Sequence, residues 1–167
     1  MKHLATLVAA TLVFGASMQA APPESKHKAE LEKMKSLEGV WEGEGSDGNP
    51  AHFSYTVVSA GNTVMETIDH THMAEMMVTM YHLDGDNLMM THYCSAGNQP
   101  RMRLVSSTSN SLTFKMFDIT NLASENDGHM SGVTITWKDK DHITSDWTYS
   151  KDGKEQHHGV FKLSRKS

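Results

Sequence analysis

MVTMYHLDGDNLMMTHYCSAGNQPRM, residues 77–102, is the stretch of sequence that decides the fold. Two runs rich in methionine and aromatic residues flank Asp84-Gly85-Asp86, and a glycine-centred turn between two such runs is a strong signal of a β-hairpin. A loop that contains glycine, asparagine and proline follows, and a third strand begins after it. The stretch therefore predicts antiparallel strands that are joined by turns.

The rest of the chain keeps the two-residue periodicity of this hairpin. About ten short strands at even spacing, with turn residues between them, are typical of an antiparallel barrel or sandwich. The expected strands are one around Trp41, segments 52–58 and 62–69, the two hairpin arms, and segments 101–107, 111–118, 133–138, 142–149 and 155–163. We therefore predict an all-β, up-and-down antiparallel β-barrel of about ten strands, with one short N-terminal helix. Trp41 is expected to close the tight-turn end, which is the end of the barrel that holds tight turns such as Asp84-Gly85-Asp86.

The first 20 residues have the pattern of a secretory signal peptide. Lys2 and His3 precede an apolar run at 4–16, and small residues follow at 17–20. The run is shorter than the roughly 20 apolar residues that a membrane span needs. We expect residues 1–20 to be removed, and the mature protein to be periplasmic or secreted with no membrane span.

A linker and a short helix are expected at residues 21–36. Pro22 and Pro23 begin the linker, and apolar residues then recur at near-helical spacing, which favours an amphipathic helix. These apolar residues are Ala29, Leu31, Met34 and Leu37. Residues 37–167 then form a single barrel domain.

Charge and cysteine content exclude some classes of partner and of scaffold. The net charge is −5 and no basic cluster occurs outside the short C-terminal tail, so nucleic acid is not an expected partner. Cys94 is the only cysteine, which excludes an intramolecular disulfide framework. A lone cysteine is more often a small buried apolar residue than a nucleophile.

The long connections of the predicted barrel fall on one rim, which we call the long-loop rim. They are residues 46–50, 70–74, 95–100 and 120–132, and the shorter connection 151–153 lies on the same rim. Alternate connections of an up-and-down barrel lie at opposite ends, and loops that exceed the minimum length often carry function. Most of the histidines lie on or near this long-loop rim. They are His52, His70, His72, His92, His129, His157 and His158.

The hairpin is also the expected wall of a ligand site. Side chains alternate along a strand, so Leu88, Met90, His92 and Cys94 share one face. A barrel of this size encloses one small ligand, and methionine gives a deformable lining. We expect a protein that binds a small apolar or amphipathic molecule inside the barrel. The predicted lining is Met76, Val78, Met80, Leu88, Met90, His92 and Cys94.

A soft-metal site is a second interpretation of the same rim. His92 and Cys94 are expected near His70, His72 and Met73. Imidazole, thioether and thiolate donors together suit copper, as Cu(I), or another soft metal. The alternative is that methionine and cysteine only fill an irregular core. No paired CxxC motif distinguishes the two interpretations.

An enzyme that uses His92 and Cys94 as base and nucleophile is a third interpretation. Side chains at i and i+2 on a strand lie about 6.5 Å apart, which is beyond hydrogen-bond reach without a bend. The sequence contains no G-x-S-x-G, HExxH or phosphate-binding loop. The pattern therefore disfavours an enzyme but leaves the interpretation open.

The segment LEGVWEGEG, residues 37–45, resembles the start of calycin-type barrels, which are the lipocalin, fatty-acid-binding and nitrobindin-like proteins. The resemblance implies that a basic residue of the last strand packs on Trp41, with Lys162 and Arg165 as candidates. The G-x-W-x-G-x-G form is similar to nitrobindin, a haem-binding barrel, and this likeness implies His158 or its neighbour His157 as the haem ligand. The middle of the chain departs from nitrobindin. Its THYC and NQP segments resemble exported bacterial proteins of the lipocalin-like type, for which the resemblance implies no activity.

Overall fold

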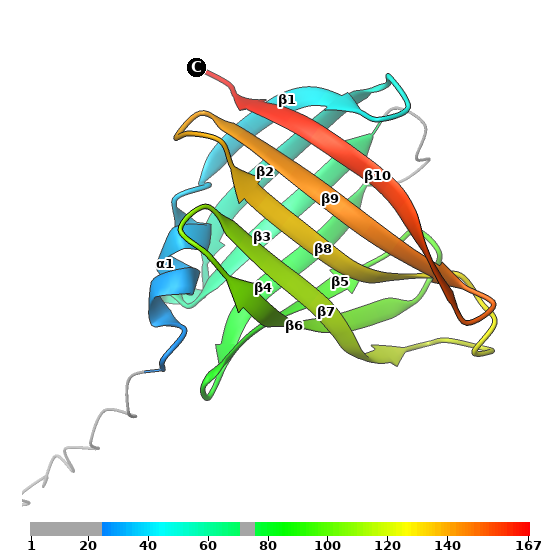
Figure 1. The fold of residues 1–167 in the computed structure, drawn as a ribbon. Coiled ribbons are helices and arrows are strands. Elements are labelled where there is room, and N and C mark those ends of the chain that lie inside the picture. Colours follow the sequence, from blue (N-terminus) through cyan, green and yellow to red (C-terminus); the bar gives the residue numbers. More distant parts are fainter. Residues whose placement is uncertain (1–24, 71–75) are drawn as a thin grey trace, which may run out of the picture.

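The computed structural model describes residues 25–70 and 76–167, apart from the side chains of His157 and His158. Within these residues ten antiparallel strands form a closed barrel, in which each strand pairs with its neighbours in sequence and the last strand pairs with the first (Figure 1). The predicted all-β barrel with one short helix is confirmed. Its elements are α1 (Lys28–Lys35), β1 (Gly39–Gly45), β2 (Pro50–Val58), β3 (Thr63–His70), β4 (Met77–Asp84), β5 (Asn87–Tyr93), β6 (Gln99–Ser107), β7 (Ser111–Thr120), β8 (His129–Trp137), β9 (His142–Lys151) and β10 (Lys154–Arg165), with a 3₁₀ turn, η1 (Ser59–Gly61), between β2 and β3.

Alternation along each strand separates an inner face from an outer face. On β2, for example, Ala51, Phe53 and Tyr55 are buried, whereas His52 and Thr56 are exposed. The inner faces of all ten strands contribute to one apolar core. Closure of the barrel removes the unpaired strand edges that an open sheet would leave.

Trp41 lies at the tight-turn end of the barrel, as predicted. Its indole Nε1 donates a hydrogen bond to the Leu37 carbonyl at 2.7 Å, and the Arg165 guanidinium lies 4.3 Å from the ring centroid. Arg165 also donates hydrogen bonds to the carbonyls of Glu38 and Ser36. Arg165 is therefore the basic residue of the last strand that packs on the tryptophan.

The helix α1 covers the same end (Figure 1). Leu31 and Met34 are buried against the core. Lys33 Nζ donates to the Ser109 carbonyl at 2.9 Å and lies 4.6 Å from the centroid of the Trp137 ring. Through Lys33, the helix thus contacts the β6–β7 turn and the Trp137 side chain of β8. Among the residues that the structure describes, no helix is long and apolar enough to cross a membrane.

The first hairpin arm faces the other way from the prediction. Met77, Thr79 and Tyr81 are the buried residues of β4. The alternate positions, which are Met76, Val78 and Met80, therefore belong to the outer face of the barrel, and the Met76 side chain is 62% exposed. The physical reason is the register across the turn, because the inward-facing Met90 pairs with Tyr81 and not with Met80.

Candidate functional site

Four polar residues form a row across four neighbouring strands on the inner face of the barrel. Tyr55 on β2 pairs with Glu66 on β3, Glu66 pairs with Thr79 on β4, and Thr79 pairs with His92 on β5. Directly opposed residues of an antiparallel pair point to the same face, with Cβ atoms about 5 Å apart. All four are buried. We call these four residues the polar row.

The carboxyl group of Glu66 is the centre of the polar row. Its Oε1 accepts a hydrogen bond from the Tyr55 hydroxyl at 2.7 Å, and its Oε2 accepts one from the Tyr81 hydroxyl at 3.0 Å. The Thr79 side chain, which lies opposite Glu66 on β4, also favours the ionised form of this carboxyl, and we assign it as a third donor. Burial raises the pKa of Glu66, while the three hydrogen bonds oppose that rise. A buried carboxyl is costly unless it is hydrogen-bonded, and here the wall of the barrel supplies the donors.

Burial also raises the pKa values of the two tyrosines that donate to Glu66, which are Tyr55 and Tyr81. Desolvation, and after it the nearby Glu66 carboxyl, raises the pKa of Tyr55 well above the usual value, and the same is true of Tyr81. Both phenols therefore stay protonated at neutral pH. They serve as hydrogen-bond donors to Glu66.

His92 extends the row by one further hydrogen bond. Its Nδ1 lies 2.9 Å from Thr79 Oγ1. We assign the Thr79 hydroxyl as a donor towards Glu66, its partner on β3, so its oxygen accepts from the ring and the proton of the neutral imidazole is assigned to Nδ1. Burial lowers the pKa of His92 to about 4. At neutral pH the ring is therefore uncharged, and Nε2 presents a lone pair.

Three buried polar atoms on the inner faces of β5 and β9 have no hydrogen-bond partner among the described residues. They are His92 Nε2, Trp147 Nε1 and Ser145 Oγ. The His92 and Trp147 ring centroids lie 4.7 Å apart, so the two side chains meet inside the barrel. Ser145 lies two residues before Trp147 on β9 and is buried on the same face. Buried polar groups are almost always hydrogen-bonded, so this trio calls for a partner from outside the chain, either water or a ligand.

The long-loop rim holds the other predicted site residues. His70 Nε2 lies 3.3 Å from Asp47 Oδ1, and the His70 ring lies edge-on to Phe161 with centroids 5.3 Å apart. Cys94 is partly buried, and its backbone N–H donates to the Asn98 carbonyl at 3.2 Å in the loop after β5. His70 and Cys94 thus have local partners at this end of the barrel.

The metal and haem predictions concern residues that the structure describes only in part. Within residues 25–70 and 76–167, no group of three or more His, Cys, Asp or Glu side chains could hold a metal ion. His72 and Met73 lie outside the described residues, and so do the side chains of His157 and His158. A soft-metal site that includes His72 and Met73, and haem ligation by His158, therefore stay predictions.

The hydrogen bond of His92 limits how this residue could act as a base for a Cys94 nucleophile. Because Nδ1 is engaged with Thr79, only Nε2 is available to accept a proton. Burial also makes His92 a weak base, since its pKa is lowered to about 4. An enzyme that uses Cys94 stays a prediction.

Sequence reasoning found His92 but missed its neighbours. The missed residues are Tyr55, Glu66, Thr79, Tyr81, Ser145 and Trp147. One signal was present in the sequence, because Glu66 stands between Val64 and Ile68 on the apolar face of a strand. A carboxylate at such a position is rarely buried unless it has partners. Its partners could be named only once the register was known.

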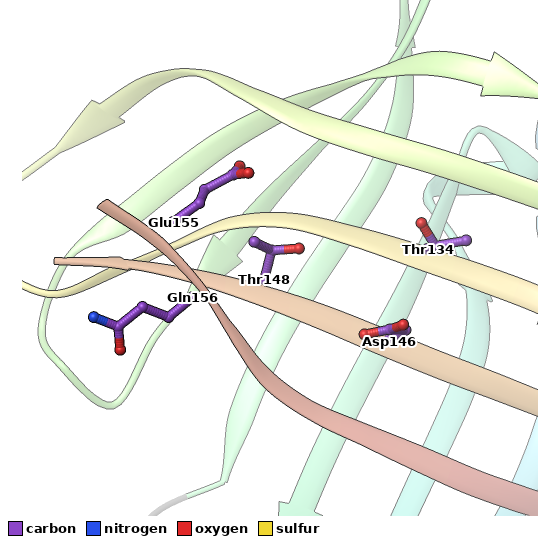
Figure 2. Close-up of a pocket in the computed structure, with 5 residues that line it drawn as sticks. All are labelled: Thr134, Asp146, Thr148, Glu155 and Gln156. Carbon is purple, nitrogen blue, oxygen red and sulfur yellow. The ribbon is translucent and has the colours of Figure 1, made fainter. Parts of the chain in front are cut away.

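A hollow on the outer surface offers a contrast with the interior. Its volume is about 290 Å³, and it is lined by Thr134, Asp146, Thr148, Glu155 and Gln156 (Figure 2). The Glu155 carboxylate is paired with Lys115 Nζ at 2.7 Å, and this ion pair lowers the pKa of Glu155. The hollow is open and polar, and its Glu155 carboxylate is already paired, so the polar row is the stronger candidate site.

No protein-family profile matches the chain, and no curated protein matches it in sequence.

Proposed function

We propose that this chain is an exported small-molecule-binding protein that holds an amphipathic ligand inside its barrel. The polar end of the ligand lies against His92, Trp147 and Ser145, and its apolar part lies among the core side chains. The observation that carries the proposal is the trio of buried, unpartnered polar atoms on these residues. A buried donor or acceptor without a partner costs about 1–3 kcal/mol, and a bound polar group offsets that cost.

The architecture supports a binding role of the calycin type. The barrel is closed and antiparallel, and Arg165 packs over Trp41 at one end. Leu88, Met90 and His92 are buried on the inner face, which supports the proposal that they line the ligand site. Met77 and Tyr81 take the places on β4 that the sequence had suggested for Met76 and Met80. The signal-peptide pattern predicted at residues 1–20 is consistent with a periplasmic or secreted carrier.

Haem or a soft metal ion is the second candidate ligand, and the tautomer of His92 favours it. Histidines that bind metals usually donate their other ring N–H to a hydrogen-bond acceptor, which fixes the ring and exposes the ligating nitrogen. In His92, Nδ1 is held by Thr79, and Nε2 has no partner. His92 then joins His158 as a candidate axial ligand.

Native mass spectrometry of the protein, purified from its own host without denaturation, tests the proposal. We expect a non-covalent organic adduct that is lost on denaturation, whereas haem or a metal would appear as its own characteristic mass. In a His92→Phe variant the adduct should be strongly reduced. A His52→Phe variant is the matched control, because His52 is exposed on the outer face.

Two results together would reject a carrier. The first is a protein that is free of any adduct, and the second is an ordered water molecule that satisfies His92 Nε2, Trp147 Nε1 and Ser145 Oγ in a high-resolution crystal structure. The polar row would then have a purely structural role.

A further inference from the structure

We infer that the polar end of the ligand is a neutral hydroxyl group, so that the ligand is an alcohol or a phenol with an apolar body. This inference rests on the proposed function and names its ligand class. It follows from three steps, which concern the charges inside the barrel, the partners already engaged, and the hydrogen-bonding capacity of the unpartnered atoms.

The first step excludes an anionic head group. Among the described residues, no lysine or arginine is buried, and Glu66 is the one buried residue with a carboxyl group. The buried imidazole of His92 is uncharged at neutral pH. A carboxylate or phosphate at this position would lose its hydration without gaining a cation, and a buried charge without a counter-ion is strongly disfavoured.

The second step excludes a cationic head group. Glu66 is the only buried carboxyl group in the described part of the chain, and the wall engages both of its oxygens. Thr79 adds a third hydrogen bond to the same carboxyl. An ammonium group has three donors and no acceptor, so it would leave the Trp147 N–H without a partner and would compete with the donors of Glu66.

The third step matches the unpartnered atoms to a hydroxyl. His92 Nε2 accepts a hydrogen bond, Trp147 Nε1 donates one, and Ser145 Oγ does either. A hydroxyl group has one O–H donor and two acceptor lone pairs, so it donates to Nε2 and accepts from Trp147 and Ser145. An ether or a ketone can only accept, and it would leave the histidine lone pair unpartnered.

The polar row itself fixes the direction of this hydrogen bond. The chain of hydrogen bonds runs from His92 Nδ1–H to Thr79 and from Thr79 to Glu66, which keeps the other ring nitrogen as an acceptor. The row thus acts as a positioning element for His92, and His92 is the residue that contacts the ligand.

A matched set of four eight-carbon probes tests the inference. The probes are 1-octanol, octanoate, octylammonium and 1-methoxyheptane, the last being an isomer of octanol without a donor. Binding to the mature protein, freed of endogenous ligand, is measured by calorimetry at pH 7.5, and the Trp147 indole N–H is followed by NMR. We expect 1-octanol to bind at least about tenfold more tightly than each other probe, which is the size of effect that one hydrogen bond gives. We also expect it to shift the Trp147 indole resonance.

Variants assign the preference to named atoms. In His92→Phe, octanol should bind no more than about twofold more tightly than methoxyheptane, because the acceptor is gone. Trp147→Phe keeps an aromatic ring but removes the indole donor, and it should weaken the binding of both octanol and methoxyheptane. The His52→Phe control should keep the full preference. If His92→Phe does not fold, Trp147→Phe and Ser145→Ala carry the test.

Different outcomes separate the failure of this inference from the failure of the proposed function. Octanoate or octylammonium bound inside the barrel as tightly as octanol would overturn the hydroxyl assignment and leave a carrier standing. A host ligand without a hydroxyl group would do the same, and so would an octanol preference that survives in His92→Phe. Binding of none of the four probes, together with a protein free of any adduct, would reject both.

Discussion

The two walls of the barrel interior differ in whether their buried polar atoms have hydrogen-bond partners. On β2–β5, each polar atom of Tyr55, Glu66 and Thr79 has a hydrogen-bond partner within the same wall. On β9, in the facing wall, Ser145 Oγ and Trp147 Nε1 have none among the described residues. Most other buried residues of β7–β10 are apolar, and they are Leu112, Phe114, Met130, Val133, Ile135, Ile143, Phe161 and Leu163.

This difference distinguishes the buried polar groups that stabilise the scaffold from those that are available to bind a ligand. A buried polar group that is satisfied by its neighbours stabilises one register of the sheet, and removing one partner leaves the other partner unsatisfied. A buried polar group without a partner destabilises the folded protein, and it is available to bind a ligand. His92 belongs to both classes, because one ring nitrogen is satisfied and the other is not.

The largest expected effect comes from removing the centre of the satisfied wall. Glu66→Leu leaves the donors of Tyr55, Tyr81 and Thr79 without their acceptor, so we expect the free energy of unfolding to fall by about 3 kcal/mol or more. The measurement is urea denaturation at pH 7. On the apolar wall, Ile135→Val is the comparison, and it should cost about 1 kcal/mol.

A rescue variant separates unsatisfied donors from lost packing. Adding Tyr55→Phe and Tyr81→Phe to Glu66→Leu removes two of the stranded hydroxyl groups, and most of the lost stability should return. A Glu66→Leu protein within 1 kcal/mol of the parent protein would contradict the view that this carboxyl anchors the wall.

The next effect is the pH dependence that His92 confers. The pKa of His92 is about 4 in the folded protein, below its ordinary value of 6.5, so the unfolded chain binds the proton first. The contribution of His92 to stability is therefore complete above pH 6.5, and it falls by roughly 3 kcal/mol as the pH drops from 6.5 to about 4. Denaturation midpoints at a series of pH values measure this decline.

Two features sharpen this measurement. Glu66 acts in the opposite sense, because its raised pKa gives a contribution that is complete below its ordinary pKa of 4.5 and is lost as the pH rises through the folded value. His92→Phe should flatten the decline between pH 6.5 and 4, whereas His52→Phe should not. An unchanged slope in His92→Phe would show that the ring is accessible to protons in the folded protein.

The smallest expected effect comes from the unsatisfied wall, and its sign is reversed. Ser145→Ala removes a buried hydroxyl that has no partner, so the free energy of unfolding of the ligand-free protein should stay the same or rise by up to about 1 kcal/mol. Thr79→Val is the matched change on the satisfied wall and should lower it by about 1–2 kcal/mol. A loss above 1 kcal/mol in Ser145→Ala would mean that a bound water already satisfies the hydroxyl.

Most of the fold was accessible from local sequence patterns. Period-two alternation and turn residues located the strands, and near-helical spacing located α1, because these signals depend only on neighbours along the chain. The inner face of β5 was also predictable, since Leu88, Met90 and His92 alternate with more polar or more exposed positions. The calycin resemblance, and not the local pattern, gave Lys162 and Arg165 as candidate partners of Trp41, and the structure shows that Arg165 is the partner.

The candidate site was accessible only in part. Alternation divides β4 into two faces but does not say which face is inside, and the methionines at positions 76 and 80 made the wrong face look apolar. The pairing of Tyr81 with Met90 decides the matter, and that pairing depends on the number of residues in the turn. The polar row needs three such registers in succession.

By itself, the sequence determined the strands, the turns, the short helix and the presence of an inward-facing imidazole at His92, because each of these follows from spacing along the chain. Only the tertiary structure decided that His92 meets Trp147 and that Glu66 lies among three donors. Contacts within the row require the register of consecutive strands, and the contact across the interior also requires the stagger with which the barrel closes. Stagger is a property of the whole ring of strands, so no local segment encodes it.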